Sequence, residues 1–435
     1  MSEIVKIILI FPLFLIFIFA PLSVFNKNNK EINLSYLNYN LIINCNILLI
    51  LSFFPIPIKD YQIILITLYF LIFLYSFIFF KIDFNNLKKN NYSGFLILFF
   101  SFVILSLVIS NELDLGWDAK YFYYIKSLFF FEGLGLEELS KFEENKWHPY
   151  FGSYIWAFFW SIPFFDLEYF GRLFYLFIFC FSIYFITIKN NKNFFFNNIL
   201  YLLFLIIFFK YERFSGLQEI LIFSFLVISS KILYELTMKK NLLDIFILLL
   251  ISNLVFWIKS EGIVYALIIM IILVLNKKIF FKEKIYFFLS IIFLFLLKNL
   301  IFIYYNFEIN AQPYNLEHIL SIKLDDFFYR VKNIIIYLGY YSLKNTLFAI
   351  SMFLLIILNF TKKNKIILTN YNLFFALNIL FIFSAYLFRD LEVIYSLRTT
   401  MERIVFTSSG FYIYLIILFI NNQIKINKKN GKLYK

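Results

Sequence analysis

The sequence of 435 residues contains few of the residues that build tight turns, disulfides and metal centres. It has only 11 Gly, 7 Pro, 2 Cys and 2 His. Cys45 and Cys180 both fall within apolar segments, which supports neither a disulfide framework nor a thiolate metal site. The sequence lacks both a Walker motif and a Gly-x-Gly-x-x-Gly motif after a strand pattern, so a nucleotide-sugar or ATP site is unsupported.

Charged residues are also scarce. They make up 15% of the chain, whereas hydrophobic residues make up 62% and the mean hydropathy is +0.81. A soluble domain of this length needs far more polar surface. Apolar runs long enough to cross a hydrocarbon core about 30 Å thick recur along nearly the whole chain. The sequence therefore predicts an all-α integral membrane protein.

The apolar runs predict about thirteen membrane-spanning helices. The first run has no clear cleavage site and is interpreted as a span rather than a signal peptide. The expected bounds are 4–25, 41–58, 61–80, 94–110, 169–188, 194–209, 217–235, 243–258, 263–276, 285–305, 344–360, 367–388 and 404–421.

The net charge of +13 comes from lysines in the short connections between these runs. That distribution is the positive-inside pattern, so we expect no nucleic-acid partner. The abundance of Phe, Tyr, Ile, Asn and Lys indicates an AT-rich genome and favours a bacterial inner membrane. The lysines expected in the cytoplasm are Lys81, Lys88, Lys89, Lys189, Lys192, Lys277, Lys278, Lys282, Lys284, Lys362, Lys363 and Lys365, together with the basic tail 422–435.

The connection 111–149 is different, because acids outnumber lysines there, and it is expected outside. Its acids are Glu112, Asp114, Asp118, Glu132, Glu137, Glu138, Glu143 and Glu144, against Lys120, Lys126, Lys141 and Lys146.

Two apolar segments, 150–165 and 169–188, lie between this outside connection and the inside Lys189, but the orientation allows one crossing only. The shorter segment contains Pro163 and ends in acids. We therefore predict that 150–165 lies at, or dips into, the outer interface, a depth that suits Trp147, Trp156 and Trp160. The same argument makes 327–343 a second outer interfacial helix.

Asp118 follows the fourth predicted span by a few residues and precedes an aromatic stretch. Its position fits either a helix cap or a functional acid next to the lipid headgroups. The motif around it then resembles the GT-C class of membrane glycosyltransferases, most closely the glycosyltransferase family 39 or dolichyl-phosphate-mannose-protein mannosyltransferase-like group. The segments that carry the resemblance are Gly116-Trp117-Asp118-Ala119, Trp147-His148-Pro149-Tyr150, Ser215-Gly216-Leu217-Gln218-Glu219, Trp257-Ile258-Lys259-Ser260-Glu261-Gly262 and Ser396-Leu397-Arg398-Thr399-Thr400-Met401-Glu402-Arg403.

The resemblance covers most of the chain from about residue 94 and implies a GT-C type bundle with interfacial helices in the first long external loop. Residues 1–93 would be N-terminal membrane helices of unknown role, 94–421 the catalytic membrane domain with its external loop at 111–168, and 422–435 the cytoplasmic tail. The implied activity is an inverting glycosyltransferase that moves a sugar from a polyprenyl-phosphate donor to an acceptor hydroxyl on the periplasmic face. The acceptor would be a glycan, a lipid or a protein.

By resemblance Asp118 is the catalytic base, and Glu219 replaces the family's more usual Asp as a second acid. Such an enzyme also needs cations to neutralise the departing lipid phosphate. It requires no cofactor, although a divalent cation between the two acids is compatible with their oxygen ligands. The remaining expected substrate contacts are Lys120, His148, Arg213, Lys259, Glu261, Lys298, Arg398 and Arg403.

Simpler interpretations stay open for several of these residues. Lys259 and Glu261 could simply form an ion pair with each other. The side chain of Lys298 could extend to the membrane interface without a role in binding, and His318 could be a simple surface residue. Arg398 and Arg403 fit ordinary loop charges. Alternative functions are an O-antigen polymerase or ligase, which would carry a long Arg-rich loop late in the chain, and a glycan flippase, which would show internal repeats and broken helices.

Overall fold

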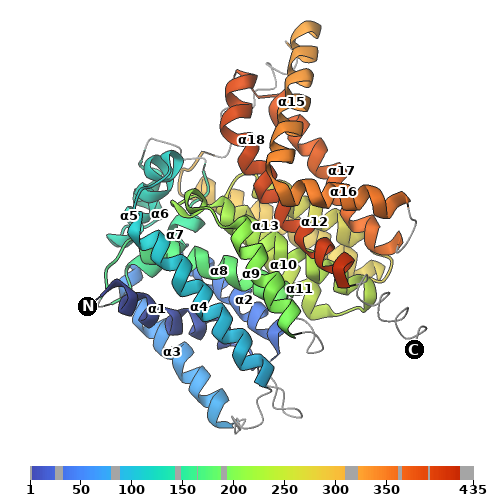
Figure 1. The fold of residues 1–435 in the computed structure, drawn as a ribbon. Helices are drawn as coiled ribbons and strands as arrows, with labels where there is room; N and C mark the ends of the chain where they lie inside the picture. The colour runs from blue at the N-terminus through green and yellow to red at the C-terminus, as the bar shows by residue number, and fades with distance from the viewer. Residues whose placement is uncertain are drawn as a thin grey trace, which may run out of the picture. The chain divides into compact units, whose positions relative to one another are not determined.

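The computed structural model describes residues 2–24, 33–79, 89–142, 148–163, 165–187, 194–308, 322–360, 365–389 and 392–421. Every regular element in these ranges is a helix (Figure 1). The helices are α1 (Glu3–Phe19), α2 (Leu34–Leu51), α3 (Ile58–Phe79), α4 (Lys89–Asn111), η2 (Ala119–Tyr123), α5 (Tyr124–Phe131), α6 (Leu136–Ser140), α7 (Phe151–Trp160), α8 (Tyr169–Thr187), α9 (Phe194–Phe208), η4 (Tyr211–Phe214), α10 (Glu219–Met238), α11 (Leu242–Ile258), α12 (Gly262–Leu275), α13 (Phe281–Tyr304), α15 (Leu324–Lys344), α16 (Thr346–Phe360), α17 (Lys365–Leu387), α18 (Val393–Ser409) and η5 (Gly410–Tyr412).

The prediction of an all-helical membrane protein is confirmed for the described chain, and each predicted span overlaps a helix. Eight of these helices are long and apolar enough to cross a membrane, or nine if the bent pair α15 and α16 forms one span. The difference from thirteen lies in short helices such as α12, whose 14 residues cover about 21 Å, less than a typical hydrocarbon core.

The chain divides into two compact units. Unit 1 consists of Met1–Ser224, Phe246–Ile263 and Ile291–Ile309, and unit 2 of Phe225–Ile245, Val264–Ser290 and Asn310–Lys435. Residues 1–93 therefore share one unit with the whole connection between α4 and α8. The turn between α2 and α3 contacts that connection directly, since Gly133 lies against Pro57 and the ammonium of Lys59 lies 4.3 Å from the ring centre of Phe131.

The second predicted span is displaced, because α2 begins and ends seven residues earlier than expected. Prolines in the turn that follows α2 stop the helix, and the helix starts early because its asparagines have partners inside the protein. Asn40 donates to the carbonyls of Ile18 and Leu22 at 3.0 and 2.9 Å, and Asn44 donates to the carbonyl of Ala20 at 2.7 Å. These hydrogen bonds satisfy carbonyls at the C-terminal end of α1, where the hydrocarbon core of a membrane would supply no water as a partner.

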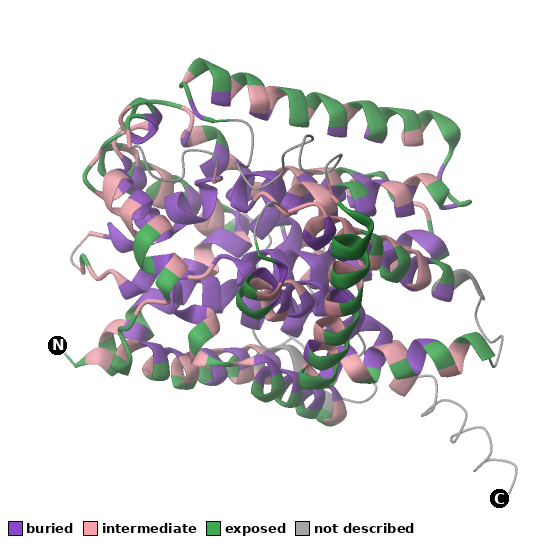
Figure 2. Cartoon of the chain, turned by 90° about the horizontal axis from the view of Figure 1, so that it is seen from above, coloured by how far each residue is buried: buried purple, intermediate pink, exposed green. Residues whose placement is uncertain are grey.

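Every residue of α7 and of α8 is buried, so these two helices lie in the core of unit 1. Figure 2 colours the buried residues of the chain purple. The segment 150–165 was expected at the outer interface, but α7 is enclosed by protein instead. Trp156 is fully buried and its indole donates to the carbonyl of Glu168 at 3.1 Å. Trp160 stacks on Phe131 with 4.3 Å between ring centres. Trp147 lies outside the described residues. The aromatic-belt interpretation is thus replaced by packing against neighbouring helices.

In unit 2, α15 contains the second predicted interfacial segment and meets α16 at an angle of 102°. It packs beside α18 (Figure 1). Arg330 donates to the carbonyl of Arg389 at 2.8 Å, and Arg398 donates to the hydroxyl of Tyr337 at 2.9 Å. Several large apolar side chains of α15, including Leu324 and Phe328, are exposed, which suits a helix lying at a lipid interface.

On the expected cytoplasmic side of unit 2, Lys240 forms an ion pair with Glu283, and its ammonium lies 3.8 Å from the ring centre of Phe280. This contact joins the turn after α10 to the start of α13. Several residues named in the sequence analysis lie outside the described residues. They are Lys81, Lys88, Glu143, Glu144, Lys189, Lys192, His318, Lys362, Lys363 and the tail 422–435.

Gly171 tests the packing of α8 on α7. A Cβ atom at this position would lie 2.4 Å from the Trp156 carbonyl oxygen. We expect Gly171→Ala to lower the free energy of unfolding by about 1–3 kcal/mol through overpacking, measured as a lower apparent Tm of the purified protein. Gly339→Ala is the control, because a Cβ there meets nothing within 4 Å and helix propensity favours alanine. Equal melting temperatures for the two variants would contradict the close approach.

Candidate functional site

The acidic connection after α4 is docked on the turn that precedes α10. The backbone N–H of Gly116 donates to the carbonyl of Ser215 at 3.0 Å, and the hydroxyl of Tyr211 donates to the carbonyl of Asp114. A Cβ on Gly116 would lie 2.9 Å from the Ser215 hydroxyl oxygen. Two segments about a hundred residues apart are therefore held together by backbone contacts.

Gly216 makes this docking possible. Its φ of +91° lies in the left-handed region that favours glycine. A Cβ there would also come within 2.4 Å of the Trp156 ring and 2.8 Å of the Cβ of Ala119. The turn thus needs glycine for its conformation and for its close approach to both neighbours. As a result Ala119 and its neighbour Asp118 lie beside the residues that open α10.

Asp118 stands at the N-cap position of η2, but its side chain makes no capping hydrogen bond and its own backbone is already helical, with φ −60° and ψ −36°. The helix-cap interpretation of this acid is therefore not supported by its geometry. The five residues of η2 form a π-helical turn, in which the N–H of Tyr124 donates to the carbonyl of Ala119. Such single π-turns frequently occur at functional sites.

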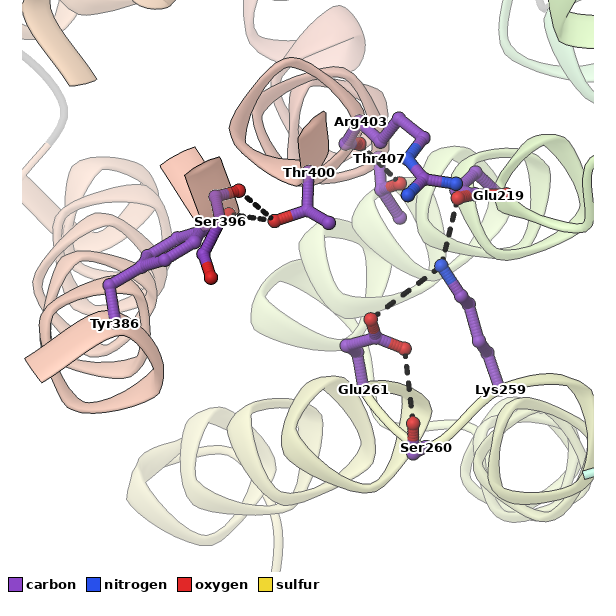
Figure 3. A network of polar contacts seen from close by, with 9 residues as sticks. All are labelled: Glu219, Lys259, Ser260, Glu261, Tyr386, Ser396, Thr400, Arg403 and Thr407. Carbon is purple, nitrogen blue, oxygen red and sulfur yellow. Dashed lines mark hydrogen bonds and ion pairs between the residues drawn. The ribbon is translucent and has the colours of Figure 1, made fainter. Parts of the chain in front are cut away.

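A buried ion cluster lies at the adjacent helix ends (Figure 3). The ammonium of Lys259 is 2.8 Å from a carboxylate oxygen of Glu219 and 3.5 Å from one of Glu261. The side chains of Lys259 and Glu219 are 10% and 6% exposed, whereas Glu261 is 31% exposed. Lys259 follows α11 and Glu219 opens α10, so the predicted ion pair of Lys259 with Glu261 is present and is extended by a second carboxylate.

The tight turn that carries Lys259 and Glu261 depends on Gly262. A Cβ there would lie 1.8 Å from the carbonyl oxygen of Val255, so only glycine lets α12 start this close to α11.

Gln218 connects this turn to the core of unit 1. It is fully buried, and its amide donates to the carbonyl of Ile258 at 2.6 Å and accepts from the N–H of Ser153 at 3.0 Å when the amide is oriented to satisfy both ends. The hydroxyl of Ser153 donates in turn to the carbonyl of Tyr123 at 2.9 Å. One polar chain therefore runs from η2 through α7 to the residue before Lys259.

The charges of this cluster act on the pKa of the Tyr123 phenol. Burial raises its pKa above the ordinary value, the positive charge of Lys259 lowers it, and the negative charges of Glu219, Glu261 and Asp118 raise it further. The Tyr123 hydroxyl is thus within electrostatic reach of all four groups. Hereafter these five residues are called the outer cluster.

His148 and Lys126 support the outer cluster from the side. The ring of His148 packs on Phe122 and Tyr123, with ring centres 5.7 and 6.4 Å apart. Lys126 is 2% exposed and donates to the carbonyl of His148 at 2.7 Å. Burial lowers the pKa of Lys126 to about 7, which is the direction expected for an ammonium removed from water.

The other predicted cations of unit 1 contact helix ends. Lys298 is 5% exposed and donates to the carbonyl of Phe256 at 2.8 Å. Its ammonium thus caps the last turn of α11 inside the protein rather than reaching the lipid interface. Arg213 donates to the carbonyl of Phe208 at the end of α9. Lys120 differs, because it is an exposed residue of η2 whose ammonium lies 5.9 Å from the ring centre of Tyr121.

Arg398 and Arg403 belong to unit 2 and both lie on α18. Arg398 bonds to Tyr337, and the carbonyl of Arg403 accepts from the hydroxyl of Thr407 at 2.8 Å. Figure 3 also shows Thr400 bonded to Tyr386 and Ser396 within the same unit.

Sequence reasoning missed Tyr123, Gln218, Ser153 and Arg172. Arg172 is fully buried near the outer end of α8 and binds both carboxylate oxygens of Glu168, at 3.0 and 2.9 Å. An arginine is rare in this lysine-rich chain, so its place beside an acid at a span end was a usable signal. The other three are uncharged and had none.

Within the described ranges, no three His, Cys, Asp or Glu side chains are grouped so as to hold a metal ion. Comparison of the chain with protein-family models, curated proteins and solved structures gives no match.

The buried ion pair can be tested by Lys259→Met. Removing one partner of a buried pair leaves the carboxylates without that cation, at a cost of about 3–5 kcal/mol, which should appear as a large fall in apparent Tm. Lys141→Met is the matched control, because the Lys141–Glu137 pair is 67% and 69% exposed and its loss should cost under about 1 kcal/mol. Similar falls in both variants would show that the pair is not buried as described.

Proposed function

We propose that this chain is an inverting glycosyltransferase of the GT-C type, with a bundle of about thirteen crossings in a bacterial inner membrane. The observation that carries the proposal is the position of Asp118 in the connection after α4, on the segment that docks through Gly116 on the turn before α10, which Glu219 of the buried ion cluster opens. The resemblance names this acid as the base, and its side chain makes no capping hydrogen bond to η2.

In the proposed reaction the carboxylate of Asp118 takes the proton of an acceptor hydroxyl. The acceptor oxygen forms a bond to C1 of the sugar while the bond from C1 to the phosphate oxygen breaks. The polyprenyl phosphate leaves with that electron pair, and the configuration at C1 inverts. A phosphate is already a good leaving group, so the reaction needs no strong general acid and no resident cofactor.

The donor's phosphate needs cations near it. Lys259 is a poor candidate for this role, because two carboxylates already face its ammonium. Lys259 is better placed to hold the carboxylates of Glu219 and Glu261 in position. Lys120 and Arg213 remain the proposed phosphate contacts in unit 1. Glu219 would then position the acceptor, or a divalent cation, rather than act as a second base.

The membrane itself supplies the donor in this proposal. A polyprenyl chain is as apolar as the lipid around it, so the sugar arrives at the periplasmic surface already tethered. The acceptor would be a glycan, a lipid or a protein that reaches the same surface.

Asp118→Asn tests the base. In purified protein supplied with radiolabelled polyprenyl-phosphate hexoses, we expect release of polyprenyl phosphate to fall by about 10²–10⁴ relative to wild type. Asp114→Asn is the control, because Asp114 is an exposed acid of the same connection and should keep wild-type turnover. Normal turnover by a folded Asp118→Asn variant would exclude this acid as the base.

A further inference from the structure

The connection after α4 carries exposed apolar side chains that the proposed reaction does not use. Trp117 is 67% exposed, and Leu113 and Tyr121 on either side of it in the sequence are 54% and 42% exposed. Hereafter these three residues are called the Trp117 surface. Single exposed apolar residues are ordinary in proteins, whereas a group of them on one segment indicates an interaction site.

The ring of Trp117 is held in place although it is exposed. Its centre lies 5.1 Å from that of Tyr121 and 5.6 Å from that of Phe122. Phe122 packs in turn on the ring of His148, with 5.7 Å between ring centres. These contacts leave most of the tryptophan side chain uncovered. The fold therefore presents this ring outward instead of packing it into the core of unit 1.

The Trp117 surface follows a helix whose exposed side is apolar. α4 is one of the helices that are long and apolar enough to cross a membrane, and it ends at Asn111, shortly before Trp117. Exposed side chains recur at every fourth position along it, at Leu96, Phe100, Ile104 and Val108. That spacing places them in one stripe. In a helix that crosses a membrane, such a stripe faces lipid.

A second apolar helix supports the same segment. α9 packs beside α4, and its exposed side chains include Ile199, Leu203 and Ile206. η4 follows α9, and its Tyr211 donates a hydrogen bond to the carbonyl of Asp114 in the connection. The Trp117 surface thus belongs to a segment that joins the predicted outer ends of two helices with exposed apolar sides. It is continuous with the surface that those helices turn to lipid.

The polar groups of this segment fit the headgroup layer of a membrane. Lys120 is exposed on η2, and its ammonium lies 5.9 Å from the ring centre of Tyr121. Trp and Tyr rings are enriched at the level of lipid headgroups, where a lysine can meet lipid phosphates. The exposed acids Glu112 and Asp114 disfavour a strongly anionic surface. The charges therefore favour zwitterionic lipid.

We propose that the Trp117 surface is inserted into the headgroup layer of the outer leaflet, with zwitterionic phospholipid as its partner. The rings of Trp117 and Tyr121 lie among the headgroups, and Lys120 contacts lipid phosphates. This contact takes the place of the aromatic belt expected on α7, whose Trp156 and Trp160 are buried. The inference does not depend on the proposed glycosyl transfer, although a lipid-linked donor would present its phosphate in the same layer.

Quenching of tryptophan fluorescence by brominated lipid tests this depth. The full chain is reconstituted in phosphatidylcholine vesicles whose acyl chains carry bromine either near the headgroup or near the bilayer centre. Trp117→Phe isolates one ring among the five tryptophans. We expect bromine near the headgroup to quench wild type strongly, and Trp117→Phe to lose most of that quenching. Bromine near the bilayer centre should quench both proteins alike.

Trp257→Phe is the matched control, because Trp257 is 1% exposed and its removal should not weaken the quenching. If Trp117→Phe keeps the wild-type quenching by bromine near the headgroup, the proposal is wrong. Quenching of Trp117 by iodide in the aqueous phase would then show that the surface faces water, as a site for a soluble glycan would. Stronger quenching of Trp117 by bromine near the bilayer centre would contradict the assigned depth.

Discussion

The ion pair of the buried Lys259 ammonium with Glu219 and Glu261 is the interaction on which the arrangement of the neighbouring helix ends of unit 1 depends. Removing charges from water is costly, and attraction in the protein interior repays that cost only when the geometry is good. The three groups come from the end of α11, the start of α10 and the turn before α12, so these helix ends must meet with little tolerance. A buried pair of this kind is weak evidence for stability and better evidence for a fixed arrangement.

Glycines make that meeting possible. Gly262 lets α12 begin against α11, and Gly216 lets the turn before α10 reach Trp156 and Ala119. A chain with only 11 glycines places three of them, Gly116, Gly216 and Gly262, at close approaches within this one region. The hydrogen bonds of Gln218 and Ser153 then connect the turn before α10 to η2. Backbone contacts therefore determine where the helix ends of the site lie, and the helix ends in turn orient its side chains.

The sequence was informative where charge and hydropathy decide the structure. Apolar runs located the helices, and the resemblance to GT-C enzymes selected Asp118, Glu219, Lys259 and Glu261 from the charges expected at their outer ends. It was less informative where a residue finds its partner in the protein interior. The asparagines of α2 bond to carbonyls of α1, which no hydropathy pattern reveals, and the buried tryptophans of α7 could not be told from an aromatic belt.

Tyr123 shows the same limit more sharply. It is one of 32 tyrosines, and only the π-turn and the surrounding charges distinguish it from the rest. Lys298 had been open to a phosphate role or to snorkelling, yet its ammonium caps a helix end through the carbonyl of Phe256. In both cases the deciding contact involves the backbone, whose position follows from tertiary packing and is invisible in the order of residues.

The central claim is that the connection carrying Asp118 is fixed on the turn carrying Glu219, and a disulfide tests it most directly. A Cβ on Gly116 would lie 2.9 Å from the side-chain oxygen of Ser215, close to the spacing that a disulfide needs. The native Cys45 and Cys180 are buried and should not interfere. In a Gly116→Cys, Ser215→Cys double variant, we predict spontaneous cross-linking under mild oxidation, detected by mass spectrometry of the digested protein. Two free thiols that remain open to alkylation would contradict the account.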